Sequence, residues 1–508
     1  MDQAQAPEGP LSEMLSGGNV TPLMPRMLLN LQNRGQLATG MSSYDPNRQQ
    51  LLDTFKDIGN VAEAFRMSHP AKHEAILEKY AGRAAIGHVR YATCGQENAR
   101  YAQPFERHHG RRWKWFSFAF NGNLSNYRQL REKLLQKRDY HFTLDTDTEI
   151  IMHELSYRLR GDSAPDLKDV LTQLSESFDG AYNITFLDAL GRMFVSRDPL
   201  GLRPLSYAVQ GKVFGAASES VALTNLGFTD VKCLNPGEAI IVDENGMRIE
   251  RYAECKRRAH CFFEWVYFSN VASLMDGRSV YQVRADSGKQ LADLEDVPTD
   301  DGNSIVVPVP DTAKASADSF AYHMGIPCME GLMRNRYVGR TFIQGANTRG
   351  SSVKNKYTPI PSILKGKRVF LVDDSIVRST TMRALVEHIR TVGGAAEVHV
   401  RVACPPIIAP CFYGIDMSTM GELFAPAMVE EGYAGVPSEE TLAKMAENLG
   451  LDSLRYLTVP GLEQAIGRTR EELCLGCVLG EYPSQCGTDM FAEAKAAYAA
   501  GKTGRTYE

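Results

Sequence analysis

The stretch from Arg368 to Thr381 reads Arg-Val-Phe-Leu-Val-Asp-Asp-Ser-Ile-Val-Arg-Ser-Thr-Thr, an apolar run that ends in two carboxylates and a hydroxyl-rich turn. Residues 369–372 are short and largely β-branched, which is typical of a parallel strand buried on both faces. From Thr381 onward the apolar residues follow helical spacing, and Gly393-Gly394 marks the end of that helix. The sequence therefore predicts a strand, a turn and a helix in succession.

The turn of this unit is suited to an anion. Ser379, Thr380 and Thr381 place hydroxyls and unpaired backbone N–H groups at the start of the helix. Asp373 and Asp374 follow the strand, at the edge where open α/β sheets bind ligands. An acidic pair beside an anion site normally requires a cation or sugar hydroxyls, whereas an ordinary turn with two solvated acids is the plain alternative.

The rest of the chain divides into two patterns. From about Cys261, strands alternate with helices (strands 304–308, 369–372 and 398–402, helices 312–324 and 381–392), which predicts a doubly wound parallel sheet. The first ~250 residues instead hold short β-rich runs with few helices, which suits an α+β sandwich. The expected strands are 84–89, 115–120, 182–187, 192–195 and 238–242, and the expected helices lie near Leu28 and over 148–160 and 167–178.

Composition narrows the class of protein. At 508 residues the chain is long enough for two to four domains, and 43% hydrophobic with 23% charged residues is ordinary for a globular protein. A net charge of -5 argues against nucleic acid or an anionic membrane recognised by bulk charge. No apolar run reaches the ~20 residues of a membrane span, and the polar start is not a secretory signal, so we expect a cytoplasmic protein.

Ten cysteines in so long a chain do not form a disulfide scaffold. The spacing Cys474-Leu-Gly-Cys477, on a loop-like stretch, fits a redox pair, half a zinc site or part of an iron–sulfur site. A long basic loop over 337–357 has little apolar periodicity and is expected to act as a lid beside the phosphate site.

The 368–381 string resembles the phosphoribosylpyrophosphate signature of type I phosphoribosyltransferases. The resemblance implies that Asp373 and Asp374 hold the ribose hydroxyls and help to place Mg²⁺, while the turn grips the 5′-phosphate. It also implies that Thr312, in a Pro-Asp-Thr segment where the family has serine, helps to ligate Mg²⁺. The residues expected to bind phosphoribosylpyrophosphate are Arg336, Arg340, Lys356, Asp373, Asp374, Ser375, Arg378, Ser379, Thr380 and Thr381.

The first half resembles the glutaminase domain of class II glutamine amidotransferases. The motifs that carry this resemblance are 31–36, 87–93, 120–124, 145–149, 179–182, 197–201 and 217–220. It implies an oxyanion hole made by the Asn121 side chain and the Gly122 backbone N–H, with donors aimed at charge that develops in the transition state. Arg90 would bind the α-carboxylate of glutamine, for which a guanidinium fork is suited, and Asp147 the α-amino group. Together the two halves resemble the amidophosphoribosyltransferase family over about residues 20–490.

That family attacks glutamine with an N-terminal cysteine freed by processing, whose α-amine serves as base. The first cysteine here is Cys94, which lies within the Arg90 motif where the family has a non-nucleophilic residue. Two readings follow: the natural start lies upstream of Met1, which is our expectation, or the glutaminase half is inactive.

Four cysteines match the positions that bind a 4Fe-4S cluster in the iron–sulfur branch of the family: Cys261, Cys411, Cys474 and Cys477. Four thiolates are the number that such a cluster requires, and a zinc site with four cysteines is the alternative. Cys255, Cys404 and Cys486 fall outside these motifs and are expected to be structural.

The expected organisation is an N-terminal nucleophile hydrolase-type αββα sandwich over 1–255, an α/β type I phosphoribosyltransferase domain with a parallel sheet over 256–470, and a cysteine-bearing segment with a helix, packed on the transferase domain, over 471–508. The resemblance implies that phosphoribosylpyrophosphate, glutamine and water yield 5-phosphoribosylamine, glutamate and pyrophosphate, the first step of de novo purine biosynthesis. It also implies a homo-oligomer inhibited by purine nucleotides. The alternatives are an ammonia-dependent transferase with an inactive glutaminase half, and a non-catalytic sensor of phosphoribosylpyrophosphate or nucleotides.

Overall fold

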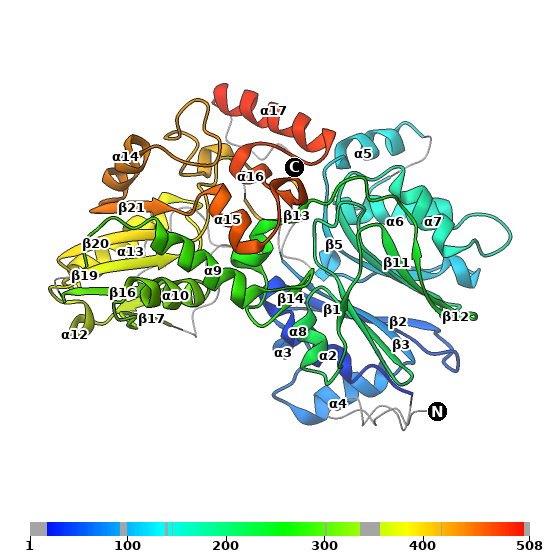
Figure 1. Cartoon of the computed structure of the whole chain (residues 1–508). Coiled ribbons are helices and arrows are strands. Elements are labelled where there is room, and N and C mark those ends of the chain that lie inside the picture. The colour runs from blue at the N-terminus through cyan, green and yellow to red at the C-terminus, as the bar shows by residue number, and fades with distance from the viewer. Residues whose placement is uncertain are drawn as a thin grey trace.

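The computed structural model describes residues 18–91, 99–137, 141–144, 146–299, 302–335, 356–417 and 419–501. Two halves lie side by side, the N-terminal half rich in antiparallel strands and the C-terminal half built on a parallel sheet (Figure 1). The change from one to the other falls near β13 (His260–Cys261), close to the position that the change of sequence pattern predicts.

The N-terminal half is built from a six-stranded sheet and two three-stranded sheets. The six strands lie in the order β12 (Gly246–Arg251), β11 (Glu238–Asp243), β7 (Met193–Ser196), β6 (Gly180–Asp188), β5 (Phe116–Leu124) and β4 (Phe105–Arg107). The smaller sheets have the orders β2 (Leu52–Ile58), β1 (Ala38–Tyr44), β3 (Ala84–Arg90), and β10 (Lys232–Cys233), β8 (Ser206–Gln210), β9 (Val213–Ala217). The five strands expected from the sequence are all present, with ends shifted by up to four residues.

Helices cover the outer faces of these sheets and complete the αββα sandwich (Figure 1). On the six-stranded sheet lie α5 (Tyr127–Leu135), α6 (Asp147–Arg158) and α7 (Leu167–Ser175), which share one apolar core with β5, β6, β7 and β11. On the opposite side lie α2 (Leu23–Asn30), α3 (Val61–Ala64) and α8 (Ser220–Thr224), with α4 (Pro70–Lys79) at the edge. Helices α6 and α7 begin at Thr146 and Asp166, whose side chains accept backbone N–H groups as N-caps.

In strand β5, the alternation of residues determines which side chains face the helices and which face the second sheet. Phe116, Phe118 and Phe120 alternate along the strand and join the core beneath the helices. The Ser117 hydroxyl, on the other face, lies 2.6 Å from the Ser42 hydroxyl of β1, so this face meets the second sheet. Asn121 continues the series of Ser117 and therefore faces the space between the sheets.

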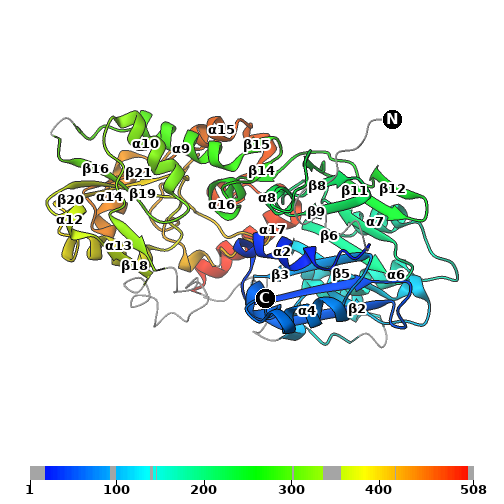
Figure 2. The same cartoon turned by 90° about the horizontal axis from the view of Figure 1, so that it is seen from below.

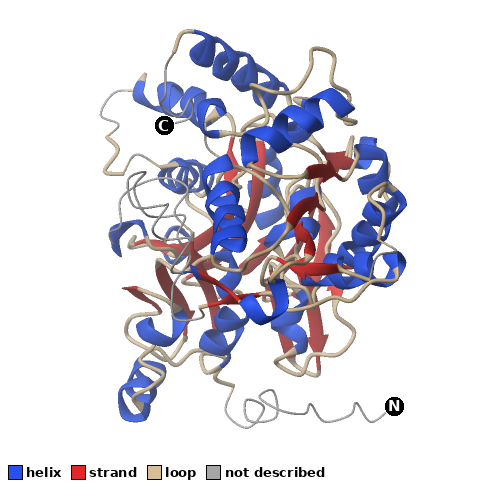
Figure 3. Cartoon of the chain, turned by 90° about the vertical axis from the view of Figure 1, so that its left-hand side faces the viewer, coloured by secondary structure: helices blue, strands red, loops and turns tan. Residues whose placement is uncertain are grey.

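The C-terminal half contains a parallel sheet in the order β16 (Ser304–Pro308), β19 (Arg368–Asp373), β20 (Glu397–Val402) and β21 (Ser453–Tyr456). Helices α9 (Val280–Asp293), α10 (Lys314–Met324) and α15 (Val459–Ile466) pack together on one side, and α13 (Ser379–Thr391) lies on the other (Figure 2). Helices thus flank the strands on both faces, as a doubly wound sheet requires (Figure 3). Further helices are α12 (Pro361–Leu364) and α14 (Glu439–Leu449), and short strands pair as β14 (Leu274–Met275) with β15 (Arg278–Ser279) and β17 (Leu332–Arg334) with β18 (Tyr357–Pro359).

The C-terminal segment lies over the junction of the halves (Figure 1). Helix α17 (Gln485–Ala499) contacts α5 through Arg128 and Glu493, whose charged groups are 3.6 Å apart. It contacts the other half through Ser484, whose hydroxyl is 3.0 Å from that of Tyr413. The stretch around Cys474 and Cys477, expected to be a loop, instead forms β22 (Leu473–Cys474) and α16 (Gly476–Leu479), because β22 pairs in parallel with the distant strand β13.

Candidate active sites in the two halves

A cavity of about 130 Å³ lies in the N-terminal half, and the residues predicted to bind glutamine meet there. Its wall includes Arg90, Asn121, Gly122 and Asp147, together with Arg34, His88, Tyr101, Ser218, Phe268 and Gly414. Arg90 ends β3, Asn121 and Gly122 lie in β5, and Asp147 opens α6. Three elements far apart in sequence thus converge on one space.

Gly122 has a backbone that only glycine accepts readily. Its φ is +148°, and a Cβ at this position would lie 1.9 Å from the Ala181 carbonyl oxygen. The Asn121 side-chain amide, one residue earlier, donates to the Ser218 hydroxyl at 3.4 Å. This part of β5 therefore presents a side-chain N–H and a glycine backbone on the same wall of the cavity.

The other two predicted residues are charged groups with opposite sign. The Arg90 guanidinium is buried and lies 5.3 Å from the centre of the Tyr101 ring. Burial raises the pKa of Asp147 to about 6, although the backbone N–H groups of Leu124 and Thr148 oppose the shift. Hence the cavity offers a guanidinium for a carboxylate and a carboxyl group that is charged above about pH 6.

Several residues of this wall were not singled out from the sequence. Arg34, His88 and Ser218 lie in the motifs that carry the family resemblance, so the resemblance could have identified them. Their positions in the sequence alone indicated no role. Phe268 and Gly414 come from the C-terminal half, so only the tertiary structure could bring them here. No cysteine lines the cavity among the residues that the structure describes, and Cys94 lies outside them.

A second candidate site lies at the carboxyl edge of the parallel sheet. Because β16 and β19 are adjacent and parallel, with Pro308 opposite Val372, the turns after both strands meet at this edge. The Asp374 backbone N–H donates to the Asp373 carboxylate at 2.9 Å, and the Ser375 hydroxyl donates to Asp374 at 2.7 Å. Burial and the neighbouring Asp374 raise the pKa of Asp373, while Lys356 opposes the shift.

Burial and mutual repulsion disfavour two charged carboxylates here, and a positive partner would stabilise their charged forms. Oxygen ligands of this kind suit Mg²⁺, so the donor set fits the cation that the resemblance implies. Thr312 lies in the turn between β16 and α10, since that helix begins at Lys314 rather than at residue 312 as predicted. This position places Thr312 in the turn that follows the strand, at the same sheet edge as the aspartates.

The predicted anion site falls at the start of α13. Ser379, Thr380 and Thr381 form its first turn, where backbone N–H groups have no helical partner. Arg378 precedes the helix and pairs with Glu422 at 2.8 Å, a contact that sequence reasoning did not foresee. Lys356 lies near Asp373 and 5.0 Å from the centre of the Tyr357 ring, whereas Arg336 and Arg340 lie outside the described residues.

The four predicted cluster cysteines share one cavity, which Arg203 and Tyr482 also line. Cys261 and Cys474 face each other across the β13–β22 pair. Burial raises the pKa of the Cys261 thiol to about 12 and also raises the pKa values of Cys474 and Cys477. Within the described ranges no group of three or more His, Cys, Asp or Glu side chains is arranged to hold a metal ion.

Comparison with known proteins agrees with this geometry. Residues 53–232 match the family model described as a glutamine amidotransferase domain. The amidophosphoribosyltransferase of Methanothermobacter thermautotrophicus is 38% identical over 470 residues, which cover 91% of each protein. The chain belongs to the amidophosphoribosyltransferase family. The Bacillus subtilis relative is 36% identical over 466 residues, or 90% of each protein.

Solved structures extend this family assignment to the fold. The glutamine phosphoribosylpyrophosphate amidotransferase of B. subtilis, complexed with ADP and GMP, superposes with a TM-score of 0.78 at 35% identity, covering 92% of this chain and 95% of the other. A structure described as the allosteric regulatory enzyme of purine biosynthesis gives 0.79 at the same identity, covering 92% and 94%. The predicted fold class, a glutaminase sandwich followed by a type I phosphoribosyltransferase domain, is therefore confirmed.

Over the residues that the structure describes, no helix combines the length and apolar character needed to cross a membrane.

Proposed function

We propose that this chain is a glutamine-dependent amidophosphoribosyltransferase, which converts phosphoribosylpyrophosphate, glutamine and water to 5-phosphoribosylamine, glutamate and pyrophosphate in the first step of purine biosynthesis. One observation carries the proposal: a single chain holds both the cavity lined by Arg90, Asn121, Gly122 and Asp147 and the Asp373–Asp374 sheet edge, within family-level similarity over nine tenths of its length. Transfer of ammonia from glutamine to phosphoribosylpyrophosphate requires both sites. The division at residues 255 and 470 is part of the same proposal.

In the glutaminase half, Arg90 binds the substrate carboxylate and Asp147 its ammonium group, which orients the amide toward β5. The Asn121 side chain and the Gly122 N–H donate to the oxygen that becomes negative as the amide is attacked. Each such donor is worth about 3 kcal/mol in the transition state. The buried Arg90 needs little reorganisation because Tyr101 already packs against it.

In the transferase half, Asp373 and Asp374 hold the ribose hydroxyls and Thr312 completes the oxygen ligands. These groups would hold Mg²⁺, which would supply positive charge to the departing pyrophosphate. The first turn of α13 (Ser379, Thr380 and Thr381, with Ser375 and Arg378) binds the 5′-phosphate through N–H and hydroxyl donors. Lys356, Arg336 and Arg340 add positive charge near the leaving group.

The four cysteines that line one cavity would supply the four thiolates of a 4Fe-4S cluster, and a four-cysteine zinc site is the alternative. Such a cluster would tie β22 and α16 to β13 and supply structural bonds in place of apolar contacts. We also propose a cytoplasmic homo-oligomer that purine nucleotides inhibit, in line with the ADP and GMP bound to the B. subtilis relative.

The test is 5-phosphoribosylamine formation from phosphoribosylpyrophosphate and Mg²⁺, with either glutamine or an ammonium salt as nitrogen donor. We expect both donors to support product when the protein carries the N-terminal cysteine with which the family attacks glutamine. Product from ammonium alone would contradict the glutamine-dependent function and favour the transferase with an inactive glutaminase half. Tight binding of phosphoribosylpyrophosphate without product from either donor would favour the sensor.

A further inference from the structure

The glutamine cavity is closed partly by the transferase half. Gly414 packs directly on Gly122: a Cβ on Gly414 would lie 2.9 Å from the carbonyl carbon and oxygen of Gly122. One residue beyond Gly122, the Asn123 amide donates to the Phe412 carbonyl at 3.0 Å. The segment 412–414 is therefore fitted against the part of β5 that carries Asn121 and Gly122.

Arg203 holds this segment in place. Its guanidinium donates to the Tyr413 carbonyl at 3.0 Å, and a Cβ on Gly414 would come within 3.1 Å of the same nitrogen. Arg203 is fully buried, and among the described residues its one carboxylate partner is Glu264 at 2.8 Å. The position of Arg203 thus depends on Glu264.

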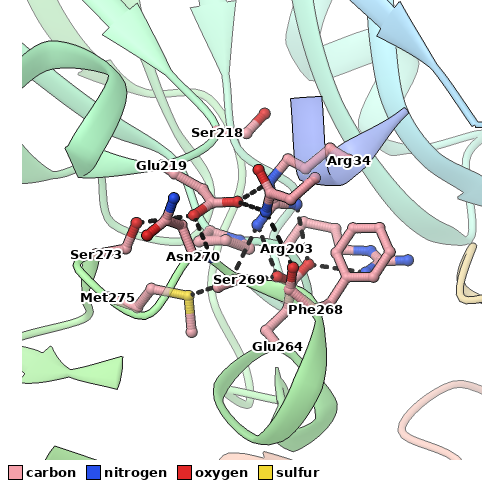
Figure 4. Close-up of polar contacts among 12 residues, drawn as sticks. Arg34, Arg203, Ser218, Glu219, Glu264, Phe268, Ser269, Asn270, Ser273 and Met275 are labelled. Atoms are coloured by element: carbon pink, nitrogen blue, oxygen red, sulfur yellow. Dashed lines mark hydrogen bonds and ion pairs between the residues drawn. The ribbon is translucent and has the colours of Figure 1, made fainter. Parts of the chain in front are cut away.

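Glu264 also fixes the opposite wall of the cavity (Figure 4). Its carboxylate accepts from Arg34 at 2.7 and 3.2 Å and from the Ser269 hydroxyl at 2.7 Å. The guanidinium groups of Arg34 and Arg203 lie 5.2 and 5.7 Å from the centre of the Phe268 ring, which lines the cavity. One carboxylate from the C-terminal half therefore organises two arginines of the N-terminal half around this ring.

The Glu264 side chain is negatively charged at neutral pH. Burial alone would raise its pKa, but Arg34 and Arg203 lower it to about 2. Arg34 has a second carboxylate partner in Glu219 at 2.7 Å, and Glu219 also accepts from the Asn270 backbone and the Ser273 hydroxyl. Neutralising Glu264 would leave Arg34 paired with Glu219 but would remove the carboxylate partner of Arg203, so we expect the 412–414 segment to be the part that loosens.

We propose that Glu264 is a positioning residue of the glutamine site, which sets the transferase-side wall through Arg203, Arg34 and Phe268. Glu264 touches no reacting atom in this scheme. It acts by keeping Gly414 against Gly122. Asn121, Gly122 and the rest of the cavity wall then keep the geometry that glutamine binding requires. The inference rests on the proposed function, because it assigns a ligand to the same cavity.

The test compares Glu264→Gln with Glu295→Gln. Glu295 is a matched control, since its side chain is also 1% exposed and pairs with a buried arginine, Arg401, at 2.5 Å, but in the transferase sheet. Calorimetry with the full chain should show glutamine binding weakened about 10- to 100-fold by Glu264→Gln and less than about twofold by Glu295→Gln. Ammonium-dependent product formation by Glu264→Gln should stay within about twofold of the original chain.

Equal effects of the two substitutions on glutamine binding would overturn this inference, since they would reveal only a loss of stability. So would a Glu264→Gln chain that binds glutamine as well as the original. If the unsubstituted chain binds no glutamine, the proposed glutamine site fails and the inference fails with it, whereas normal binding that is insensitive to Glu264 overturns the inference alone.

Discussion

Gly122 is a single residue on which the shape of the glutamine cavity depends. Its positive φ, and the 1.9 Å that would separate a Cβ from the Ala181 carbonyl oxygen, mean that any side chain would displace β5 from β6. We expect Gly122→Ala to lower glutamine-dependent product formation by about 10²- to 10³-fold, the effect of losing an oxyanion donor. Ammonium-dependent formation, measured in the same samples, should change little.

Gly161→Ala is the control for this substitution. Gly161 also has positive φ, +111°, but a Cβ there meets no atom within 4 Å. It should cost about 1 kcal/mol of stability through backbone strain and leave the use of glutamine unchanged. A Gly122→Ala chain that uses glutamine as Gly161→Ala does would show that the oxyanion donor lies elsewhere.

Asp147 makes glutamine binding depend on pH. Burial raises the pKa of its carboxyl group to about 6, so the group is protonated below that pH and cannot pair with the substrate ammonium group. Glutamine affinity, measured by calorimetry, should therefore fall about tenfold from pH 7 to pH 5. Asp147→Asn should bind weakly at every pH, with no such dependence.

The matched control is Asp188→Asn. Burial also raises the pKa of Asp188 to about 6, but this carboxylate pairs with Arg192 and does not line the cavity. The pH dependence should survive in that variant. If it disappears there and persists in Asp147→Asn, then Asp147 is not the group that titrates.

At the scale of elements, the strand β19 and the helix α13 form a single binding unit. The carboxylates end the strand and the unpaired N–H groups begin the helix, so one sheet edge serves a cation and an anion. Replacing both Asp373 and Asp374 by Asn should reduce product formation with either nitrogen donor by about 100-fold or more, because cation-mediated charge stabilisation is worth several kcal/mol.

Glu397→Gln is the control for the double substitution. Glu397 begins β20 at the opposite edge of the same sheet and pairs with Arg368 at 2.6 Å. Its removal should leave calorimetric binding of Mg²⁺-phosphoribosylpyrophosphate within about twofold of the original. Undiminished turnover after loss of both aspartates would place the sugar elsewhere.

At the scale of the whole molecule, the cysteine cavity joins the C-terminal segment to the start of the transferase half. Cys474 and Cys477 come from β22 and α16, Cys261 from β13, and Cys411 from the segment that reaches the glutamine cavity. Protein purified without oxygen should contain about four iron and four sulfide per chain. Cys477→Ser should lose both and unfold at a lower temperature, because cluster bonds contribute to folding.

Cys404→Ser should keep its iron, since Cys404 is buried but does not line that cavity. Iron and sulfide analysis with thermal unfolding checks both variants. One zinc per chain without sulfide would instead support the four-cysteine zinc site.

Local stretches of the sequence predicted the longer strands and helices, but not β22 and α16, since β22 pairs with the distant strand β13. The alternation in β5, the apolar runs of β16 and β19 and the helical spacing of α13 are local patterns, and local patterns set strand and helix. Through their resemblance to the family, the motifs also predicted which residues bind glutamine and phosphoribosylpyrophosphate. Some helices and strands begin or end at residues other than those predicted, because a cap or a turn sets the boundary. Helix α10, which begins at Lys314, is an example.

Which distant segments meet was settled by the folding of the whole chain. No spacing predicts that Cys261 lies opposite Cys474, that Gly414 packs on Gly122, or that Glu264 binds both Arg34 and Arg203. These contacts form when the two halves pack together, because buried charges must find partners and apolar faces must be covered at the same time. This packing depends on the whole chain rather than on any short stretch of sequence.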